Sequence, residues 1–202
     1  MSGTRVDRRE QMAHQTRRDI LAAARRLFAE RGYAATSIND IAAEAGVAVQ
    51  TIYARLGSKR GMLLALIDLI DEEAGVSQLV PGIGNATTPH EALRAGIRIS
   101  RAVHQRSGDL IEALFTAAGA ESELADAVAE GHRRHREGAR FTIGRIQELG
   151  GLRGGLPPKH AQALFALSTN HEAWRELTEG HHLGWDTAEA RLTDALTRSL
   201  LA

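Results

Sequence analysis

Polar side chains able to hydrogen-bond to base edges are concentrated between two apolar stretches in the first third of the chain. They carry amide, hydroxyl or guanidinium groups, and they are Asn39, Gln50, Thr51 and Arg55. An amide can pair with adenine and a guanidinium with guanine, although a guanidinium can equally bind a phosphate. The residue types therefore indicate recognition of nucleic acid, and they leave open which contacts are to bases and which to phosphates.

A possible anion site follows directly. Ser58 can cap a helix with its hydroxyl, and Lys59 stands next to it. Free amides at a helix start and an adjacent ammonium attract phosphate, so we expect Lys59 to contact a DNA backbone rather than only water. Tyr53 could point its hydroxyl at the same backbone, and the alternative for this residue is a core aromatic.

Two short helices must position these groups. Thr36 or Ser37 can cap the first helix, and Asp40 stands three residues after Ser37 as a capping-box partner. Gly46 can adopt the positive φ that ends a helix sharply. A second helix is expected over residues 49–56, with its polar groups turned outward.

Helices of about eight residues are not stable alone, so these two must pack on a third. Residues 17–31 supply it, and the apolar face of that helix carries Ile20, Ala24, Leu27 and Phe28. A three-helix unit with a glycine in the turn and a polar second helix is the helix-turn-helix arrangement that fills a DNA major groove.

Residues 17 to about 64 resemble the N-terminal domain of the TetR family of transcriptional regulators. The matching positions are Phe28, Gly32, Tyr33, Thr36, Asp40, Ile41, Ala42, Ala45, Gly46, Val47, Thr51, Ile52, Tyr53 and Lys59. The chain departs from the family at Ala48, where a hydroxyl often caps the recognition helix, and at Leu56, which replaces a common aromatic.

The resemblance implies an all-α fold, in which an N-terminal three-helix helix-turn-helix head is joined by a connector helix to a helical ligand-binding and dimerisation body. It also implies a symmetric dimer on a near-palindromic double-stranded operator. The candidates for DNA contact are Thr36, Ser37, Asn39, Gln50, Thr51, Tyr53, Arg55 and Lys59.

Charge is divided unevenly along the 202 residues, although the formal net charge is zero. Residues 1–60 carry 11 Lys/Arg and 6 Asp/Glu, a balance of +5 that leaves −5 on the remainder. A basic unit on an acidic body orients one end toward phosphates. We expect a DNA-binding domain over residues 1–60 and an effector-binding and dimerisation domain over residues 61–202, with residues 1–16 mobile.

Neither a secretory signal nor a membrane anchor is expected. The N-terminus is polar and arginine-rich, and the longest apolar run, residues 62–67, is far shorter than the roughly 20 residues of a membrane span. The chain has no cysteine, so disulfides and Cys-based metal sites are excluded. These features predict a cytoplasmic protein.

The remaining sequence shows helical rather than alternating periodicity. A connector helix is predicted from Met62 to near Glu73, and a loop follows over residues 75–89. Further helices are predicted over residues 90–106, 109–118, 121–149, 159–179 and 187–201. No strand is expected.

An effector pocket is expected inside this body. The candidate lining residues are aromatic or polar and stand on otherwise apolar helix faces; they are His104, Phe115, Asn170, His171 and Trp174. The pattern places His171 and Trp174 on one face with Leu164 and Leu167. A large aromatic beside inward histidines could supply stacking area and orienting hydrogen bonds. The alternative is a core tryptophan with buried, hydrogen-bonded histidines.

The final helix carries Leu192, Leu196 and Leu200, which recur every four residues. Following the family arrangement, in which the last two helices form a four-helix bundle with their copies, we expect this stripe to form the dimer interface. Ordinary packing onto the body is the alternative.

Other functions have less support. His132 and His135 stand three apart but are flanked by arginines, so no metal site is expected. No nucleophile turn with a Ser/His/Asp order is present, and neither an enzyme nor a cofactor is expected. The resemblance implies a repressor released from DNA by a small-molecule effector, and the alternative is a constitutive or architectural DNA-binding protein without an effector. A body of about 140 residues exceeds what dimerisation requires, which favours the first.

Overall fold

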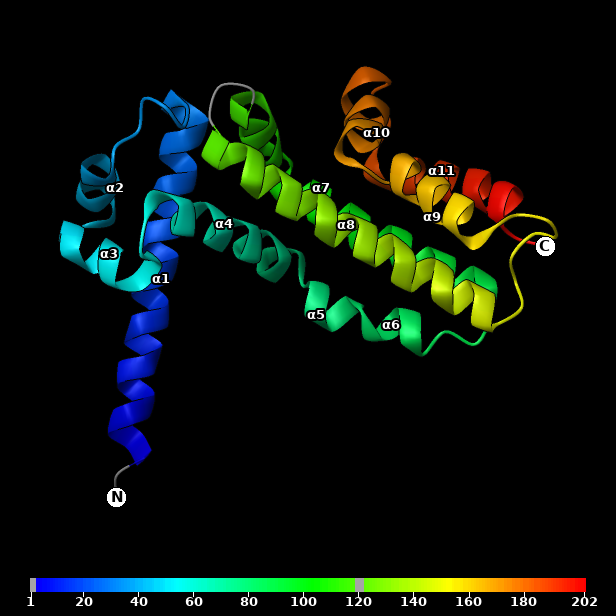
Figure 1. Ribbon diagram of the computed structural model, residues 1–202, viewed down its shortest axis with the longest axis horizontal. Coiled ribbons are helices and arrows are strands. Elements are labelled where there is room, and N and C mark those ends of the chain that lie inside the picture. The colour runs from blue at the N-terminus through cyan, green and yellow to red at the C-terminus, as the bar shows by residue number, and fades with distance from the viewer. Residues whose placement is uncertain (1–2, 119–121) are drawn as a thin grey trace. The chain divides into compact units, whose positions relative to one another are not determined.

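The computed structural model describes residues 3–118 and 122–202, and within these ranges the chain forms helices and no strand (Figure 1). A single antiparallel bridge joins Leu152 to Leu201. The predicted all-α class is therefore confirmed. None of the helices in these ranges is both long and apolar enough to cross a membrane.

The described helices are α1 (Gly3–Arg31), α2 (Ile38–Ala45), α3 (Val49–Leu56), α4 (Lys59–Ala74), α5 (Val76–Leu79), α6 (Pro81–Gly84), α7 (Pro89–Ala118), α8 (Ser122–Glu148), α9 (Pro158–Ser168), α10 (His171–Arg175), the π-helical turn η1 (Glu176–Gly180) and α11 (Trp185–Leu200). They divide into two compact units. Unit 1 comprises Met1–Leu69 and Glu112–Ala129, and unit 2 comprises Ile70–Ile111 and Glu130–Ala202.

Helix α1 is longer than the sequence predicts. It begins at Gly3, so the structure differs from the mobile segment expected over residues 1–16, of which residues 1 and 2 lie outside the described ranges. The stretch has no proline and contains three Arg and two Gln, which favour helix. This segment is also continuous with the later part of α1, which is buried in the core of unit 1 from Ile20 onward. It can therefore stay helical without an apolar face of its own.

The helix-turn-helix elements form where the sequence predicts them. Ser37 caps α2: its Oγ accepts from the Asp40 N–H at 3.1 Å, while Asp40 Oδ2 accepts from the Ser37 N–H at 2.8 Å. Gly46 ends α2 with a φ of 65°, a left-handed conformation that favours glycine. Helix α3 spans residues 49–56 as expected.

Unit 1 buries one apolar core beneath these helices. Its fully buried members from α1, α2, α3 and α4 include Ile20, Leu21, Ala24, Ile41, Ile52, Met62, Leu63 and Leu66. Gly61 lies so close to the end of α3 that a Cβ would overlap the carbonyl oxygen of Leu56. The position of α3 is thus set by packing on both sides, by α1 below and by the start of α4.

Two predicted segments of the body differ in detail from the structure. The expected loop over residues 75–89 contains the single-turn helices α5 and α6, the second of which begins with Pro81 at a position that suits proline. The helices predicted over 90–106 and 109–118 are joined in α7, with a kink at Ser107, whose φ is −135° and ψ is 18°.

The single helix predicted over residues 159–179 is wrong, because the chain turns at Thr169 and Asn170. Ser100 Oγ donates to the Thr169 carbonyl at 2.6 Å, and the Asn170 side chain caps α10 by accepting from the Ala173 N–H at 2.8 Å. The predicted common face is therefore also wrong. Leu164 and Leu167 are 42% and 66% exposed, whereas Trp174, beyond the turn, is buried.

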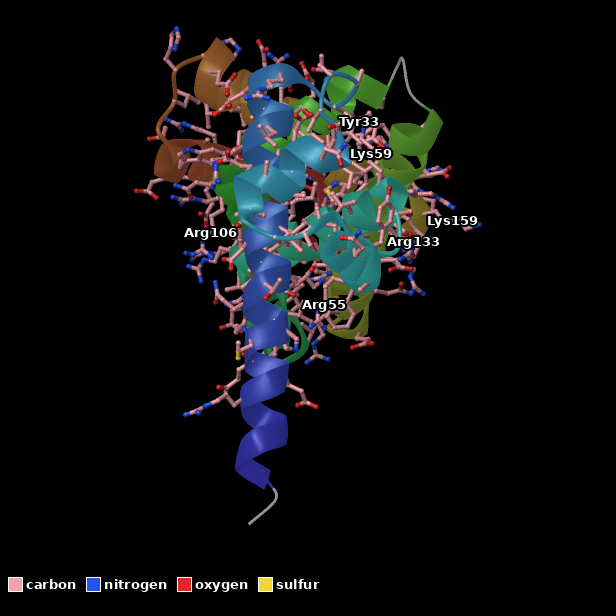
Figure 2. The ribbon with its side chains drawn as sticks, turned by 90° about the vertical axis from the view of Figure 1, so that its left-hand side faces the viewer. Tyr33, Arg55, Lys59, Arg106, Arg133 and Lys159 are labelled. Atoms are coloured by element: carbon pink, nitrogen blue, oxygen red, sulfur yellow. The ribbon has the colours of Figure 1, made fainter. Side chains whose placement is uncertain are left out.

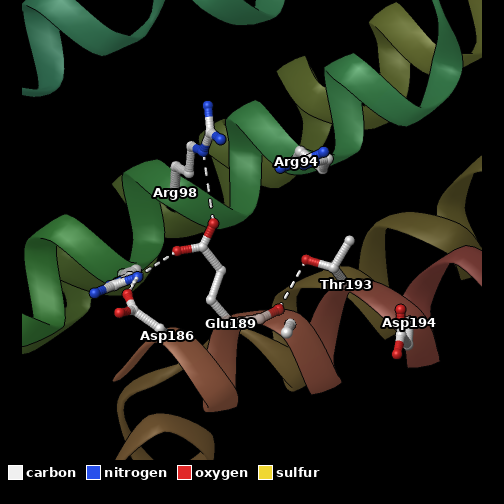
Figure 3. A pocket seen from close by; sticks show the side chains of 8 residues that line it. Arg94, Arg98, Asp186, Glu189, Thr193 and Asp194 are labelled. Carbon is white, nitrogen blue, oxygen red and sulfur yellow. Dashed lines mark hydrogen bonds and ion pairs between the residues drawn. The ribbon is translucent and has the colours of Figure 1, made fainter. Parts of the chain in front are cut away.

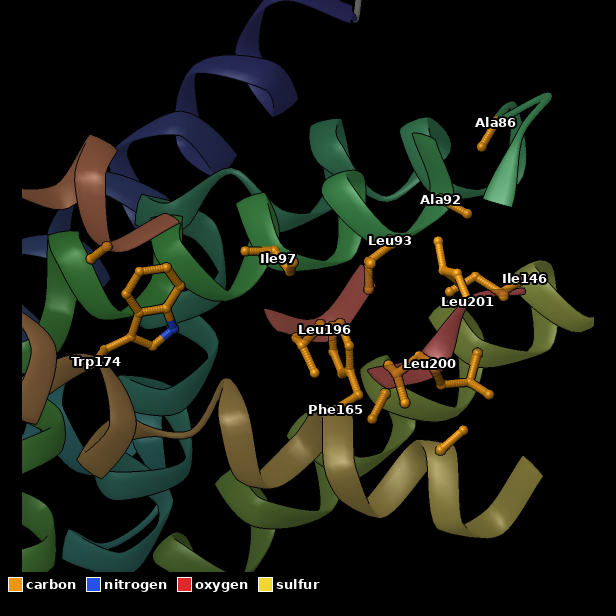
Figure 4. Close-up of a cluster of buried hydrophobic side chains, with 14 residues drawn as sticks. Ala86, Ala92, Leu93, Ile97, Ile146, Phe165, Trp174, Leu196, Leu200 and Leu201 are labelled. Atoms are coloured by element: carbon orange, nitrogen blue, oxygen red, sulfur yellow. The ribbon is translucent and has the colours of Figure 1, made fainter. Parts of the chain in front are cut away.

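The core of unit 2 lies between α7, α8, α9 and α11 (Figure 4). Leu196 and Leu200 belong to this core, and Leu192 packs against it partly buried. The assignment to a dimer interface is therefore wrong for Leu196 and Leu200, which face inward and enter a core that includes Phe165, whereas it stays a prediction for the half-buried Leu192.

Helix α3 offers a direct test of capping. Ala48 is its N-cap residue and makes no side-chain cap hydrogen bond. Ala48→Ser should raise the free energy of unfolding by about 1 kcal/mol, because a serine Oγ can accept from a free amide of the first turn. Chemical denaturation measures this change. Ala54→Ser, in the exposed middle of the same helix, is the control and should be neutral or slightly destabilising. Equal effects at both positions would contradict the capping argument.

Candidate functional site

The outward face of α3 carries most of the predicted base-contact groups. Gln50 and Arg55 are exposed, Thr51 is half-buried, and Tyr53 is 51% exposed. The core-aromatic alternative for Tyr53 is therefore excluded. Ile52 is fully buried, so it fixes the rotation of the helix and directs the polar side chains to the surface.

The candidates on and before α2 divide into three cases. Asn39 is exposed in the first turn and remains available. Ser37 is exposed, but its hydroxyl is engaged in the cap with Asp40, whose side-chain bond to Ser37 lowers the pKa of that carboxyl. Thr36 is 1% exposed, and its hydroxyl donates to the Gly32 carbonyl at 2.8 Å. Thr36 is thus a structural residue, and its prediction as a DNA contact is corrected.

Lys59 lies at the start of α4 with its ammonium on Tyr33 (Figure 2). Its Nζ donates to the Tyr33 carbonyl at 3.0 Å and stands 3.8 Å from the centre of the Tyr33 ring, a cation–π contact. Ser58 caps α4 as predicted, since its Oγ accepts from the Gly61 N–H at 3.0 Å. The alternative in which Lys59 contacts only water is therefore excluded. The sequence did not predict that the Lys59 ammonium has Tyr33 as a partner within the fold. In the sequence, the one indication of this partner was that Gly32 and Tyr33 are among the positions that match the family.

Three histidines from three helices meet in unit 2. The rings of His104 on α7 and His171 on α10 stack at 5.7 Å between centroids, and His135 on α8 approaches His104 edge-on at 6.5 Å. His104 Nδ1 lies 2.8 Å from the Ser100 carbonyl, and His135 Nε2 lies 3.0 Å from the Ala166 carbonyl. Both nitrogens must carry the proton, because a carbonyl only accepts. Of this cluster, His135 was not among the predicted pocket residues.

Trp174 and Asn170 have structural roles beside this cluster. Trp174 is 1% exposed, its Nε1 donates to Ser100 Oγ at 2.9 Å, and its ring packs on Trp185 at 5.5 Å. Asn170 caps α10. Phe115 is 37% exposed and belongs to unit 1, so unit 2 does not bring it to the histidines.

Burial disfavours the charged form of two of these histidines, His104 and His135. Desolvation lowers the pKa of His104 to about 4, and the neighbouring His171 and His135 add to the effect. Desolvation also lowers the pKa of His135, and His132 and Arg136 contribute in the same direction. In the described part of the chain, no three His, Asp or Glu side chains are grouped so as to hold a metal ion. His104 and His135 are therefore neutral hydrogen-bonding rings at neutral pH.

Known proteins resemble the chain in two ways. Residues 20–66 match the family described as "Bacterial regulatory proteins, tetR family". The HTH-type transcriptional regulator TtgR of Pseudomonas putida is 40% identical over 67 residues, which are 33% of this chain and 32% of that regulator. The match thus spans about a third of that relative's length.

Solved structures resemble nearly the whole chain. A transcriptional regulator from Saccharomonospora viridis in complex with choline has a TM-score of 0.71 at 21% identity, covering 94% of this chain and 99% of that one. The regulator FadR from Bacillus subtilis in complex with stearoyl-CoA has a TM-score of 0.71 at 19% identity, covering 89% and 96%. At these identities the likeness establishes the fold.

Acid should destabilise the body through His104. Its folded-state pKa of about 4 lies below the usual value of 6.5, so the unfolded state binds more protons between these values and stability falls as pH falls. From pH 6.5 to 5, above most carboxylate titration, His104 should account for a loss of about 1.5 kcal/mol. Denaturation at both pH values measures it. His104→Gln should remove this loss, and His160→Gln, at an exposed position, should not. An unchanged loss in His104→Gln would contradict the assignment.

Proposed function

We propose that this chain is a repressor that binds a near-palindromic operator as a homodimer and leaves the operator when a small-molecule effector binds. By its N-terminal domain, the chain belongs to the TetR family of transcriptional regulators. The observation that carries the proposal is the exposed polar face of α3. The buried Ile52 fixes the orientation of this helix, and the capped helix α2 precedes it. Such a helix can enter a major groove, and a symmetric dimer presents two of them. The regulator would act on the chromosome, which implies a cytoplasmic location.

We assign residues 1–60 to DNA binding and residues 61–202 to effector binding and dimerisation. Asn39, Gln50, Thr51 and Arg55 are proposed as base or phosphate contacts, with Tyr53 and Ser37 at the edge of the same surface. Lys59 is proposed to serve both the fold and a phosphate. Its link to Tyr33 uses one of the three hydrogens of the ammonium and leaves its charge in place.

The histidine cluster is the proposed effector site in this body. His104 and His171 supply stacked rings and hydrogen-bonding nitrogens, and burial keeps the His104 ring neutral. Chains of the same fold bind ligands as different as choline and stearoyl-CoA, so the fold leaves the effector's chemistry open. Release requires tighter effector binding to the state that cannot bind DNA, and operator DNA must then weaken effector binding by the same factor.

The dimer face requires a new assignment, because Leu196 and Leu200 of α11 face inward. We place it on the outward side of α9, where Leu164 and Leu167 stand three residues apart and are 42% and 66% exposed. Leucines three residues apart are neighbours on the surface of a helix, and when exposed they form an apolar surface that a second copy can cover.

Binding to DNA from around its own gene should separate the contact types. Arg55→Ala and Gln50→Ala should reduce the preference for operator over random DNA, because their side chains reach base edges. Lys59→Ala should weaken binding to every sequence and reduce the slope of log affinity against log salt by about 0.9, the value for one lost phosphate contact. Fluorescence anisotropy over a salt series measures both quantities.

The second lysine of the chain provides the control for this experiment. The chain has two lysines, and the other, Lys159, is exposed at the start of α9 in unit 2. Lys159→Ala should leave affinity and slope unchanged. If Lys59→Ala lowered affinity with an unchanged slope, the lysine would act only through Tyr33, and if no variant altered DNA binding the proposed function would fail.

Substitutions on α9 and α11 should have opposite consequences. Leu167→Glu should give a folded monomer with weak operator affinity, because it places a charge on an exposed interface. Leu196→Glu should unfold the body, since Leu196 is 3% exposed and an unpaired charge would be buried. Light scattering and circular dichroism distinguish the outcomes. A dimeric Leu167→Glu variant would remove α9 from the interface.

A further inference from the structure

A charged groove separates α7 from α11 in unit 2 (Figure 3). Its volume is about 520 Å³, and its lining is almost wholly ionic: Arg94, Arg98 and Arg101 from α7, and Asp186, Glu189 and Asp194 with Ala190 and Thr193 from α11. The arginines stand four and three residues apart, so they form one stripe along α7. Three positive and three negative groups give the groove a formal charge of zero.

One end of the groove is closed by its own ion pairs. Arg101 Nη1 contacts Asp186 Oδ1 and Glu189 Oε2, each at 2.7 Å. The side chains of Arg101 and Glu189 are only 21% and 17% exposed, so this pair is well sheltered from water. Thr193 Oγ1 donates to the Glu189 carbonyl at 2.8 Å. These contacts hold α11 to α7 and leave no place for a ligand.

The other end is open and only partly neutralised. Arg98 meets Glu189 through Nε alone, at 3.5 Å, and its side chain is 57% exposed. In the ranges 3–118 and 122–202, Arg94 and Asp194 form no ion pair, and Figure 3 shows them on opposite walls of the groove. Arg94 and Arg98 are like charges at i and i+4, an arrangement that is unfavourable until an anion lies between them.

The requirements of this open end define its ligand. A carboxylate can bind two guanidinium groups in a planar, charge-assisted arrangement. A phosphate dianion would also face three carboxylates in a groove of zero formal charge. A ligand that carries an ammonium beside its carboxylate avoids this repulsion, because the ammonium can face Asp194.

We propose that the open end of this groove binds a free α-amino acid or a closely similar zwitterion, with its carboxylate on Arg94 and Arg98 and its ammonium toward Asp194. The lining of this site contains none of the clustered histidines, and its test needs no DNA. It therefore goes beyond the proposed function, and each can fail without the other.

Calorimetry on the full chain without DNA tests the site. The probes are the free L-amino acids, with acetate and methylammonium as molecules that carry only one of the two charges. At least one amino acid should bind about tenfold or more tightly than acetate, because both walls of the groove are used. Arg94→Gln should weaken that binding about tenfold, and Asp194→Asn should abolish the preference for the amino acid over acetate.

Arg140→Gln is the matched control, since it removes one exposed arginine of unit 2 outside the groove and should leave binding unchanged. Circular dichroism verifies that the exposed substitutions leave the helices intact. Absence of binding by every amino acid, or binding that Arg94→Gln does not weaken, overturns the site. Acetate binding as tight as that of the amino acids overturns the zwitterion and leaves a simple anion site.

Discussion

Helix α3 is stable only through its neighbours, since eight residues do not form a stable helix alone in water. Ile52 fixes its rotation against the core of unit 1, and Gly61 allows α4 to begin against the Leu56 carbonyl. A helix packed in this way can present Gln50 and Arg55 in a fixed direction. The polar face is therefore a consequence of the packing behind it, and any change in α1 or α4 reaches the surface that would meet DNA.

Lys59 shows how a single side chain can take part both in the packing of unit 1 and in the proposed contact with DNA. Its contacts with the Tyr33 carbonyl and ring tie the first residue of the connector helix to the segment between α1 and α2. A lysine held in this way has lost side-chain entropy before any ligand arrives, so a phosphate would meet a preorganised charge. The same contacts would pass a movement of α4 to the head, which a release mechanism requires.

Local chemistry decided which elements could be predicted. The capping box of Ser37 and Asp40 and the left-handed Gly46 depend on residues close in sequence, and the prediction of α2 and α3 is confirmed. The break at Thr169 depends on Ser100, 69 residues away, so periodicity could not show it. The spacing of Leu196 likewise specifies an apolar face but not its partner, and the core of unit 2 rather than a second copy covers that face.

The two sites proposed in unit 2 differ because their charges are handled differently. At the histidine cluster, desolvation and mutual repulsion keep His104 uncharged, so a ligand there would exchange stacking and neutral hydrogen bonds. In the groove, Arg101 and Glu189 form a sheltered ion pair, whereas Arg94 is exposed to water. An ion bound by Arg94 loses less hydration than one brought to the cluster, which makes the groove suited to charged ligands and the cluster to neutral ones. Because both lie along α7, a ligand at either site acts on the same helix.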